Sequence, residues 1–197
     1  TAGYMHDQPR REFYAKMDAA NVDLKAFDDK FYFKLTGSHL QPVLDTLVYL
    51  KHETQVWFEI TTLLIPGHND SDQELHAMSE WIAEQLGPDV PLHFTAFHPD
   101  HKMRDIPATP LATLTRARTI ARSKGLRYVY TGNVVDRDGG ATLCPTCNKA
   151  LIQRDWHQIS DYRLTATGQC SCGTNIAGHF GPAQENFGRR RIPIHIA

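Results

Sequence analysis

Apolar and polar positions along residues 1–135 follow two periods in turn, one helical and one strand-like. The alternation predicts α-β-α-β-α-β-α-β, with connections between strands that are long enough to hold a helix. Such an order predicts right-handed βαβ units around a parallel sheet. The expected helices are 10–20, 41–51, 71–86 and 110–125, and the expected strands are 21–27, 56–65, 92–97 and 128–133.

Polar residues recur on one face of three of these strands. A doubly wound sheet has continuously apolar strands, because helices cover both of its faces. A barrel with a functional lumen accounts better for the pattern, and four strands cannot close a barrel. The sequence therefore predicts an α/β fold with a partial (βα) barrel. The polar positions are Asp23, Lys25, Glu59, Thr61, His93 and Thr95.

The pattern of apolar and polar residues changes after residue 135, where a turn-rich linker over 136–140 leads into a segment with little helical periodicity. All four cysteines of the chain lie in this segment, and a basic sequence follows it. We expect three parts: half of a barrel over 1–135, a four-cysteine zinc-ribbon-like domain over 136–185, and a basic tail over 186–197.

The cysteines form two close pairs, Cys144-Pro-Thr-Cys147 and Cys170-Ser-Cys172. Four thiolates supply the tetrahedral set of a structural zinc site, and close pairs favour metal over a disulfide framework. The second pair is one residue shorter than the usual knuckle. The alternatives are two unlinked thiol pairs, or replacement of a cysteine by His157 or His179.

Composition narrows the function classes. The chain has 21 Lys and Arg against 22 Asp and Glu, for a formal charge of -1. This balance argues against a nucleic-acid binder, which needs a concentrated positive field. The sequence contains neither a long apolar run nor a visible signal peptide, so we expect no membrane partner. The paired cysteines suggest a reducing, cytoplasmic location.

Two strand ends carry candidate chemistry. Asp23 and Lys25 lie in one predicted strand, where burial is costly unless the charges pair or meet a ligand. The alternative is a salt bridge in the lumen without any ligand. His98 follows the next-to-last strand, where an imidazole can bind a cofactor or relay a proton, whereas His101 is expected to face solvent. The loop over 64–70 is interpreted as a plain turn that connects a strand to a helix.

Several of these segments resemble one family. The runs Asn-Val-Asp-Leu-Lys-Ala-Phe, Thr-Thr-Leu-Leu-Ile-Pro-Gly, Phe-His-Pro-Asp and Thr-Gly-Asn-Val are similar to radical S-adenosylmethionine (SAM) enzymes of the glycyl-radical-activase type. The likeness is greatest to the AmmeMemoRadiSam radical SAM enzymes and covers residues 1–180. It implies a partial (βα)6 barrel in which a 4Fe–4S cluster cleaves SAM reductively to a 5′-deoxyadenosyl radical. That radical abstracts hydrogen from a substrate, which is a backbone glycine in many activases.

The resemblance also implies site residues and partners. Lys25 and Asp23 match strand residues that contact polar groups of SAM, and His98 matches a SAM-contacting histidine. Thr61 and Asn133 are weaker lumen candidates, inferred from their positions at strand ends. Association within the family makes AMMECR-type and Memo-type proteins candidate partners.

One departure from the family is large. The Cys-x3-Cys-x2-Cys motif that holds the cluster is absent from the sequence, and the four cysteines belong to the ribbon. Thr1 to Tyr4 resembles the end of the third strand of the family, so we expect the first barrel half to lie outside this chain. We predict that the chain alone binds no cluster. The alternatives are a barrel enzyme with Lys25 as a Schiff-base lysine and His98 as its acid–base, and a non-catalytic binding module.

Overall fold

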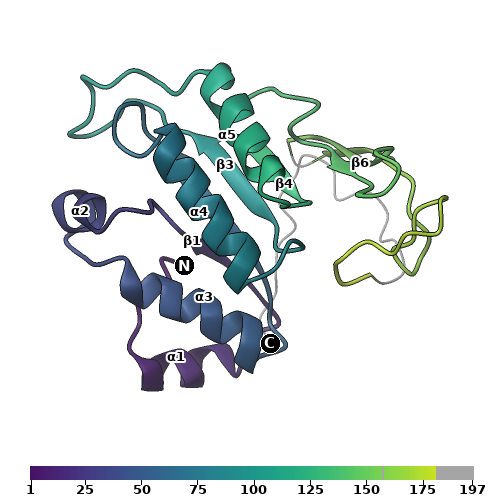
Figure 1. The fold of residues 1–197 in the computed structure, drawn as a ribbon, viewed down its shortest axis with the longest axis horizontal. Helices are drawn as coiled ribbons and strands as arrows, with labels where there is room; N and C mark the ends of the chain where they lie inside the picture. The colour runs from purple at the N-terminus through teal and green to yellow at the C-terminus, as the bar shows by residue number, and fades with distance from the viewer. Residues whose placement is uncertain (157, 181–197) are drawn as a thin grey trace, which may run out of the picture. The chain divides into compact units, whose positions relative to one another are not determined.

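The computed structural model describes residues 1–156 and 158–180, and the chain divides into two compact units, Thr1–Val134 and Val135–Ala197 (Figure 1). His157 and the basic tail expected over 186–197 lie outside the described residues. Among the described residues, no helix combines the length and apolar character that a membrane crossing requires.

The first unit is an α/β layer with a four-stranded parallel sheet. The strands are β1 (Ala19–Asp23), β2 (Trp57–Leu64), β3 (Leu92–Ala96) and β4 (Val129–Gly132), in the spatial order β1-β2-β3-β4. The main helices are α1 (Asp7–Tyr14), α3 (Gln41–Glu53), α4 (Asp72–Gln85) and α5 (Leu111–Ser123). The predicted α/β class and parallel sheet are confirmed. A sequential order is that of a barrel wall, whereas a doubly wound sheet reverses its order at a switch point.

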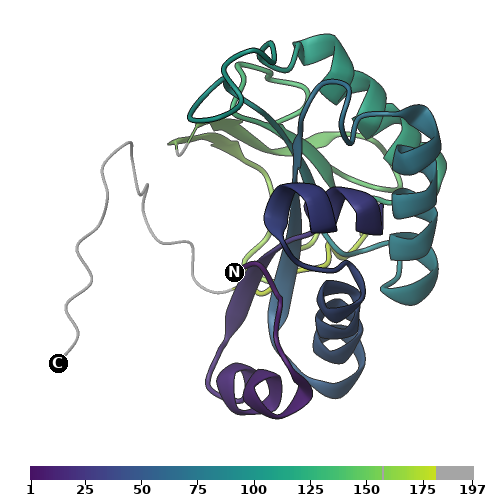
Figure 2. The same cartoon turned by 90° about the vertical axis from the view of Figure 1, so that its left-hand side faces the viewer.

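The two faces of the sheet differ sharply. One face packs against the helices, which lie together on one side of the strands (Figure 2). Its side chains are fully buried, because each strand presents alternate residues to the helical layer. The residues opposite are half-buried or exposed. The buried set includes Val22, Ile60, Leu64, Leu92 and Phe94, all 0% exposed.

The start of the chain departs from the predicted boundaries. The helix expected over 10–20 is α1, which ends at Tyr14, and turn hydrogen bonds from Lys16 and Met17 follow it. The strand expected over 21–27 begins at Ala19 and ends at Asp23. Lys25 therefore lies beyond the strand, because the pairing of β1 with β2 ends at Asp23 and the backbone groups that follow bond to side chains.

A short helix after β1 was not predicted. Asp28 caps α2 (Asp29–Phe31) by accepting a hydrogen bond from the Lys30 amide, and a π-helix, η1 (Tyr32–Thr36), continues it. Gly37 ends this segment at a φ of 66°, in the left-handed region. The element is too short to show a helical repeat of apolar residues.

Ser71-x-x-Glu74 is the sequence pattern of a capping box, and Thr109-Pro110 is that of a cap followed by a first helical residue. Both helices start within one residue of the expected position, but the contacts at their starts differ. Ser71 Oγ caps α4 by accepting from the Glu74 amide at 3.3 Å, but the Glu74 carboxylate turns to the amide of Phe27 instead of completing a capping box. Pro110, and not Thr109, occupies the cap position of α5. The Thr109 hydroxyl is buried and joins two strand ends, since it donates to the Leu64 carbonyl at 2.5 Å and accepts from the Phe97 amide at 3.0 Å.

The second unit contains a small antiparallel sheet of β5 (Thr142–Leu143), β6 (Ala150–Asp155) and β7 (Gln158–Tyr162). Asp136 opens the turn that precedes it, accepting hydrogen bonds from the amides of Gly139 and Gly140.

Candidate functional site

The face of the sheet turned away from the helices carries a row of polar side chains, which we call the open face. The strand register pairs Asp23 with Thr61, Thr61 with His93, and His93 with Tyr130. Neighbouring strands are about 4.8 Å apart, so these four residues follow one another across the sheet. All four are partly exposed, in contrast to the buried residues of the opposite face.

Asp23 and Lys25 form an ion pair at the end of β1. Lys25 Nζ lies 3.0 Å from Asp23 Oδ2, and their side chains are 39% and 38% exposed. The pairing compensates both charges, while the exposure leaves each able to contact a ligand.

The backbone after β1 is held by side chains from three other elements. Tyr32 Oη accepts from the Lys25 amide at 3.0 Å, and burial raises the pKa of Tyr32 to about 12. Thr62 Oγ1 donates to the Leu24 carbonyl at 2.7 Å. Glu74 Oε1 accepts from the Phe27 amide at 2.6 Å. The path of the chain past Asp23 is thus fixed without strand pairing.

The contacts of Asn69 show that the 64–70 loop is more than a plain turn between a strand and a helix. The residue is fully buried, and its Oδ1 accepts from the Ile65 amide at 2.7 Å. Its Nδ2 donates to the carbonyls of Lys25 at 2.6 Å and Leu63 at 2.9 Å. The loop after β2 is therefore bonded to the segment after β1. An amide residue two positions after the Pro66-Gly67 pair was the available signal.

The other predicted residues occupy separate places. Thr61 lies in the polar row and donates to Asn21 Oδ1 at 2.9 Å. His98 follows β3 with an exposed side chain, and the part of the chain that the structure describes gives its ring no hydrogen bond. Asn133 follows β4 at a φ of 59°, with its Nδ2 donating to the Ala96 carbonyl at 3.2 Å. Lys25, His98 and Asn133 each lie just past a strand end, and their roles remain predictions.

The sequence placed Glu59 and His93 on the polar face without giving them a role. Glu59 Oε2 lies 2.7 Å from His93 Nε2, and Trp57 Nε1 donates to the second Glu59 oxygen at 3.3 Å. The His93 ring stacks on Tyr130 with centroids 5.0 Å apart. The Glu59 carboxylate is thus held by an imidazole and an indole.

The four cysteines gather in the second unit, where their Sγ atoms all lie within 4.8 Å of one another. Tight turns bring them together. The Cys144 carbonyl accepts from the Asn148 amide, and the Cys170 carbonyl accepts from the Gly173 amide, both at 2.9 Å. Gly173 adopts a φ of 90°, which favours glycine.

The spacing of these thiols fits one metal ion. Sγ of Cys144 lies 3.6 Å from that of Cys172, and Sγ of Cys147 lies 3.7 Å from that of Cys170. Tetrahedral coordination with metal–sulfur bonds of about 2.3 Å places ligand sulfurs roughly 3.8 Å apart. In a 4Fe–4S cluster each thiolate binds a different iron, which separates the sulfurs further. The group can therefore bind a metal ion.

The thiols differ in acidity. The Thr174 hydroxyl, hydrogen-bonded to Cys172, lowers the pKa of Cys172 to about 6. The Lys149 amide lowers the pKa of Cys147, but burial and the neighbouring thiols outweigh it and raise that pKa to about 11. Ionisation of one thiol thus opposes ionisation of its neighbour, a repulsion that a bound cation would relieve.

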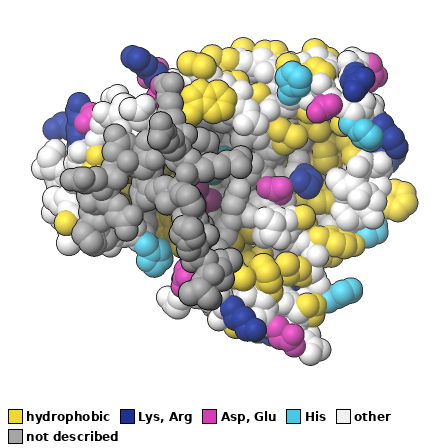
Figure 3. All heavy atoms as spheres, turned by 180° about the vertical axis from the view of Figure 1, so that it is seen from behind, with side chains coloured by type: hydrophobic (Ala, Val, Ile, Leu, Met, Phe, Trp, Pro, Cys, Tyr) yellow, Lys and Arg dark blue, Asp and Glu magenta, His cyan; other side chains and the backbone are white. Residues whose placement is uncertain are grey.

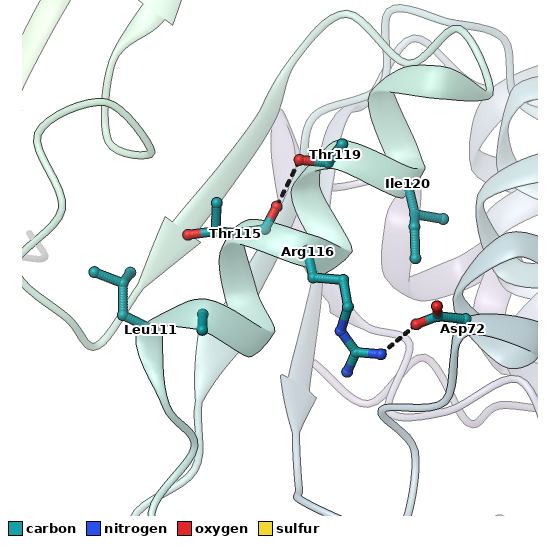
Figure 4. A pocket seen from close by; sticks show the side chains of 7 residues that line it. Asp72, Leu111, Thr115, Arg116, Thr119 and Ile120 are labelled. Atoms are coloured by element: carbon teal, nitrogen blue, oxygen red, sulfur yellow. Dashed lines mark hydrogen bonds and ion pairs between the residues drawn. The ribbon is translucent and has the colours of Figure 1, made fainter.

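A hollow on the helical layer involves none of the predicted site residues (Figure 4). Arg116 of α5 reaches across it to the Asp72 carboxylate and donates to the Asp70 carbonyl. The charged side chains across the back of the molecule are mixed in sign, with no gathering of Lys and Arg among the described residues (Figure 3). The charge balance of the sequence is therefore also seen on that surface.

Comparison of the sequence with known proteins finds an uncharacterized relative. No protein-family model matches the chain. The uncharacterized protein MJ0808 of Methanocaldococcus jannaschii is 41% identical over 178 residues, which are 89% of this chain and 52% of that protein. The chain thus spans about half the length of this relative.

A solved structure has a similar architecture over part of this chain. A domain of pyruvate-formate lyase-activating enzyme from Bacteroides vulgatus superimposes with a TM-score of 0.56 at 16% identity, covering 65% of this chain and 75% of the domain. A radical SAM methyltransferase from Sphaerobacter thermophilus matches with a TM-score of 0.47 at 19% identity, over 59% of this chain and 34% of that one. At 16% identity, the likeness to the first of these structures shows the fold.

Proposed function

We propose that this chain is the carboxy-terminal part of a radical SAM barrel of the AmmeMemoRadiSam type, with the open face turned to the lumen. The observation that carries the proposal is the two-faced sheet, whose sequential parallel strands are covered by helices on one side only. The polar row on the other side ends at Asp23 and Lys25, at the carboxyl end of β1. Sites of parallel barrels are built at that end.

Hydrogen bonds along the outer edge of β1 are evidence for a sheet that extends beyond this strand. The Thr1 amine donates to the Asn21 carbonyl at 2.8 Å, and the Asp23 amide donates to the Thr1 carbonyl at 2.9 Å. These two bonds are the pattern of a parallel pairing. A further barrel strand in this position would continue the wall past β1.

The residues of the open face fit SAM. Its amino-acid end carries an ammonium and a carboxylate, which an adjacent carboxylate and ammonium, as in Asp23 and Lys25, can contact. We assign His98, Thr61 and Asn133 to the same ligand by position. Asp23 and Lys25 would hold and orient the ligand through charge, and the stacked and hydrogen-bonded residues around His93 would line the lumen beside it.

The iron–sulfur cluster does not fit this chain. The Cys-x3-Cys-x2-Cys motif is absent from the sequence, and all four thiols form the compact group in the second unit. The cluster would therefore be held by polypeptide outside these residues. SAM bound to such a cluster would supply a 5′-deoxyadenosyl radical for hydrogen abstraction. The proposal leaves the substrate of the whole protein open and includes proteins among the candidate substrates.

We assign zinc to the four-cysteine site, with a structural role. Four protein thiolates close the coordination sphere and leave no open position for a substrate. AMMECR-type and Memo-type proteins remain the proposed partners, and the cytoplasm the proposed location, on the resemblance and the cysteine pattern.

The test uses two proteins, this chain and the product of the longest open reading frame that contains it. Both are reconstituted anaerobically with iron and sulfide. We expect the chain to hold zinc and no cluster, and the longer protein to form a cluster and release 5′-deoxyadenosine from SAM. In the longer protein Lys25→Ala and Asp23→Asn should weaken SAM binding, whereas replacement of the exposed Lys30 by Ala should not.

Two results would overturn the proposal. One is a cluster on this chain whose absorbance bleaches on reduction in the presence of SAM. The other is a longer protein that releases no 5′-deoxyadenosine. Borohydride trapping of a carbonyl compound at Lys25 would favour the Schiff-base alternative instead.

A further inference from the structure

Asn69 uses all of its amide hydrogen-bonding groups within the protein. Its two Nδ2 hydrogens go to the carbonyls of Lys25 and Leu63, and its Oδ1 accepts from Ile65. The side chain is 0% exposed. A buried amide with every group paired is rigid, because any rotation would break a hydrogen bond in a place that water does not reach.

Lys25 is held at both ends of its backbone and loosely at its side chain. Tyr32 binds its amide, and Asn69 binds its carbonyl. Its Nζ has one ion pair, to Asp23, and the side chain is 39% exposed. The direction in which Lys25 leaves the backbone is therefore set by Tyr32 and Asn69, and the ion pair selects among the positions that remain.

We propose that Asn69 is a positioning residue for ligand binding by Lys25, and that the loop after β2 thereby sets the affinity of the open face for the carboxylate of its ligand. The inference rests on the proposed function for the identity of that ligand, SAM. The role of Asn69 in orienting Lys25 stands on the hydrogen bonds alone.

The chemistry of the position requires an amide. Aspartate would set a carboxylate against the carbonyl oxygens of Lys25 and Leu63 and could donate to neither. Alanine would leave those two part-buried carbonyls and the buried Ile65 amide without this partner. Asn69→Ala thus frees the Lys25 peptide, and Asn69→Asp repels it.

The first test reads the position of Lys25 without any ligand. In this 197-residue chain, acetylation of lysines by an N-hydroxysuccinimide ester is followed by peptide mass spectrometry, with exposed Lys30 and Lys34 as internal standards. We expect Asn69→Ala to change the Lys25 rate severalfold relative to both standards. Hydrogen exchange at the Lys25 and Phe27 amides should accelerate as well, because they belong to the same held segment.

Ser79→Ala is the matched control. Ser79 is fully buried in α4, and its hydroxyl donates to the Leu75 carbonyl of the same helix. Tyr32→Phe is the second variant, because it keeps the buried ring and removes the opposite hold on Lys25. It keeps the test open if Asn69→Ala does not fold, and it should shift the Lys25 rate in the same way.

The second test uses the longer protein with SAM as the probe. We expect Asn69→Ala to raise the KM for SAM roughly tenfold with a smaller change in kcat, as for a misplaced binding group. SAM should also protect Lys25 from acetylation in the wild-type protein, and less so in the variant. A uniform loss of folded protein would lower kcat and leave KM unchanged.

The outcomes separate the two ideas. If the wild-type longer protein neither binds nor cleaves SAM, the proposed function fails, and the acetylation pattern still decides whether Asn69 positions Lys25. If the wild type cleaves SAM but Asn69→Ala and Tyr32→Phe match Ser79→Ala in Lys25 reactivity and in KM, the positioning role is wrong.

Discussion

Oε2 of Glu59 lies 2.7 Å from Nε2 of His93, so a carboxylate–imidazole pair joins β2 to β3 across the open face. The pair has no counterpart on the helical face, where the neighbouring positions are apolar and fully buried. Because the side chains are 39% and 30% exposed, water screens their attraction. The Glu59–His93 contact therefore contributes little to the stability of the sheet.

The Glu59–His93 pair should contribute little to folding. A double-mutant cycle with Glu59→Gln and His93→Gln should give a coupling of about 0.5–1 kcal/mol, as for other half-exposed ion pairs. Urea unfolding at low and high salt measures it, and the coupling should shrink as salt rises. A salt-independent coupling of several kcal/mol would show that the pair is a buried structural element instead.

Two adjacent leucines test whether the sheet has one bare face. Leu64 is 0% exposed beneath the helices, whereas Leu63 is 37% exposed on the open face. Leu64→Ala should lower the free energy of unfolding by about 2–5 kcal/mol, the usual cost of a buried leucine. Leu63→Ala should cost less than about 1 kcal/mol. Equal losses in chemical denaturation would mean that the open face is covered in this chain.

Metal binding should be required for the order of the second unit. Its buried hydrophobic side chains among the described residues are few, namely Ala141, Cys144, Leu151, Cys170 and Ile176. A unit with so small a core depends on a bound ion for its fold. Cys170→Ser should abolish the bound zinc, measured by mass spectrometry of metals, and expose residues 142–162 to proteolysis.

The first unit provides the control for metal loss. Hydrogen exchange in the core strands β2 and β3 should be unchanged by Cys170→Ser or by a chelator, because none of the four thiols belongs to that sheet. A zinc content that survives Cys170→Ser, or a loss of protection in β2 and β3, would contradict the assignment.

The sheet could be predicted because local signals and tertiary packing agree there. Strand-length apolar runs such as 56–65 are bounded by turn residues, and the alternation of polar residues correctly placed Thr61 and His93 on one face. The four cysteines were equally predictable, since their spacing brings thiols together through two local turns. In each case the signal lies within about ten residues of sequence.

The parts that escaped prediction depend on contacts between distant residues. The end of β1 at Asp23 is set by Asn69 and Glu74, more than 40 residues away. The loop after β2 has the composition of a plain turn, and only the fold shows that Asn69 holds the Lys25 peptide. The position of Glu74 in the sequence fits a capping box, but its carboxylate accepts a hydrogen bond from the distant Phe27 amide instead.

The Glu74 carboxylate, which accepts from the Phe27 amide, makes the stability of the fold depend on pH. Partial burial raises the pKa of Glu74 above its ordinary 4.5, and it outweighs the Phe27 amide bond, which lowers it; the Asp28 and Asp70 carboxylates raise it further. The folded protein therefore holds this proton more tightly than the unfolded chain does. The stability gained from it is complete below pH 4.5 and is lost as pH rises through the folded-state pKa.

Glu74→Gln should remove this loss, because glutamine keeps an oxygen for the Phe27 amide and carries no charge to bury. In urea unfolding between pH 4 and pH 8, roughly the range over which a carboxyl group with a raised pKa titrates, the stability of the variant relative to the wild type should increase with pH. Glu84→Gln, an exposed glutamate on the same helix, is the control and should leave the pH profile unchanged. A Glu74→Gln variant that loses stability relative to the wild type as pH rises would show that the ionised carboxylate is the form the fold prefers, and that the Phe27 hydrogen bond outweighs burial.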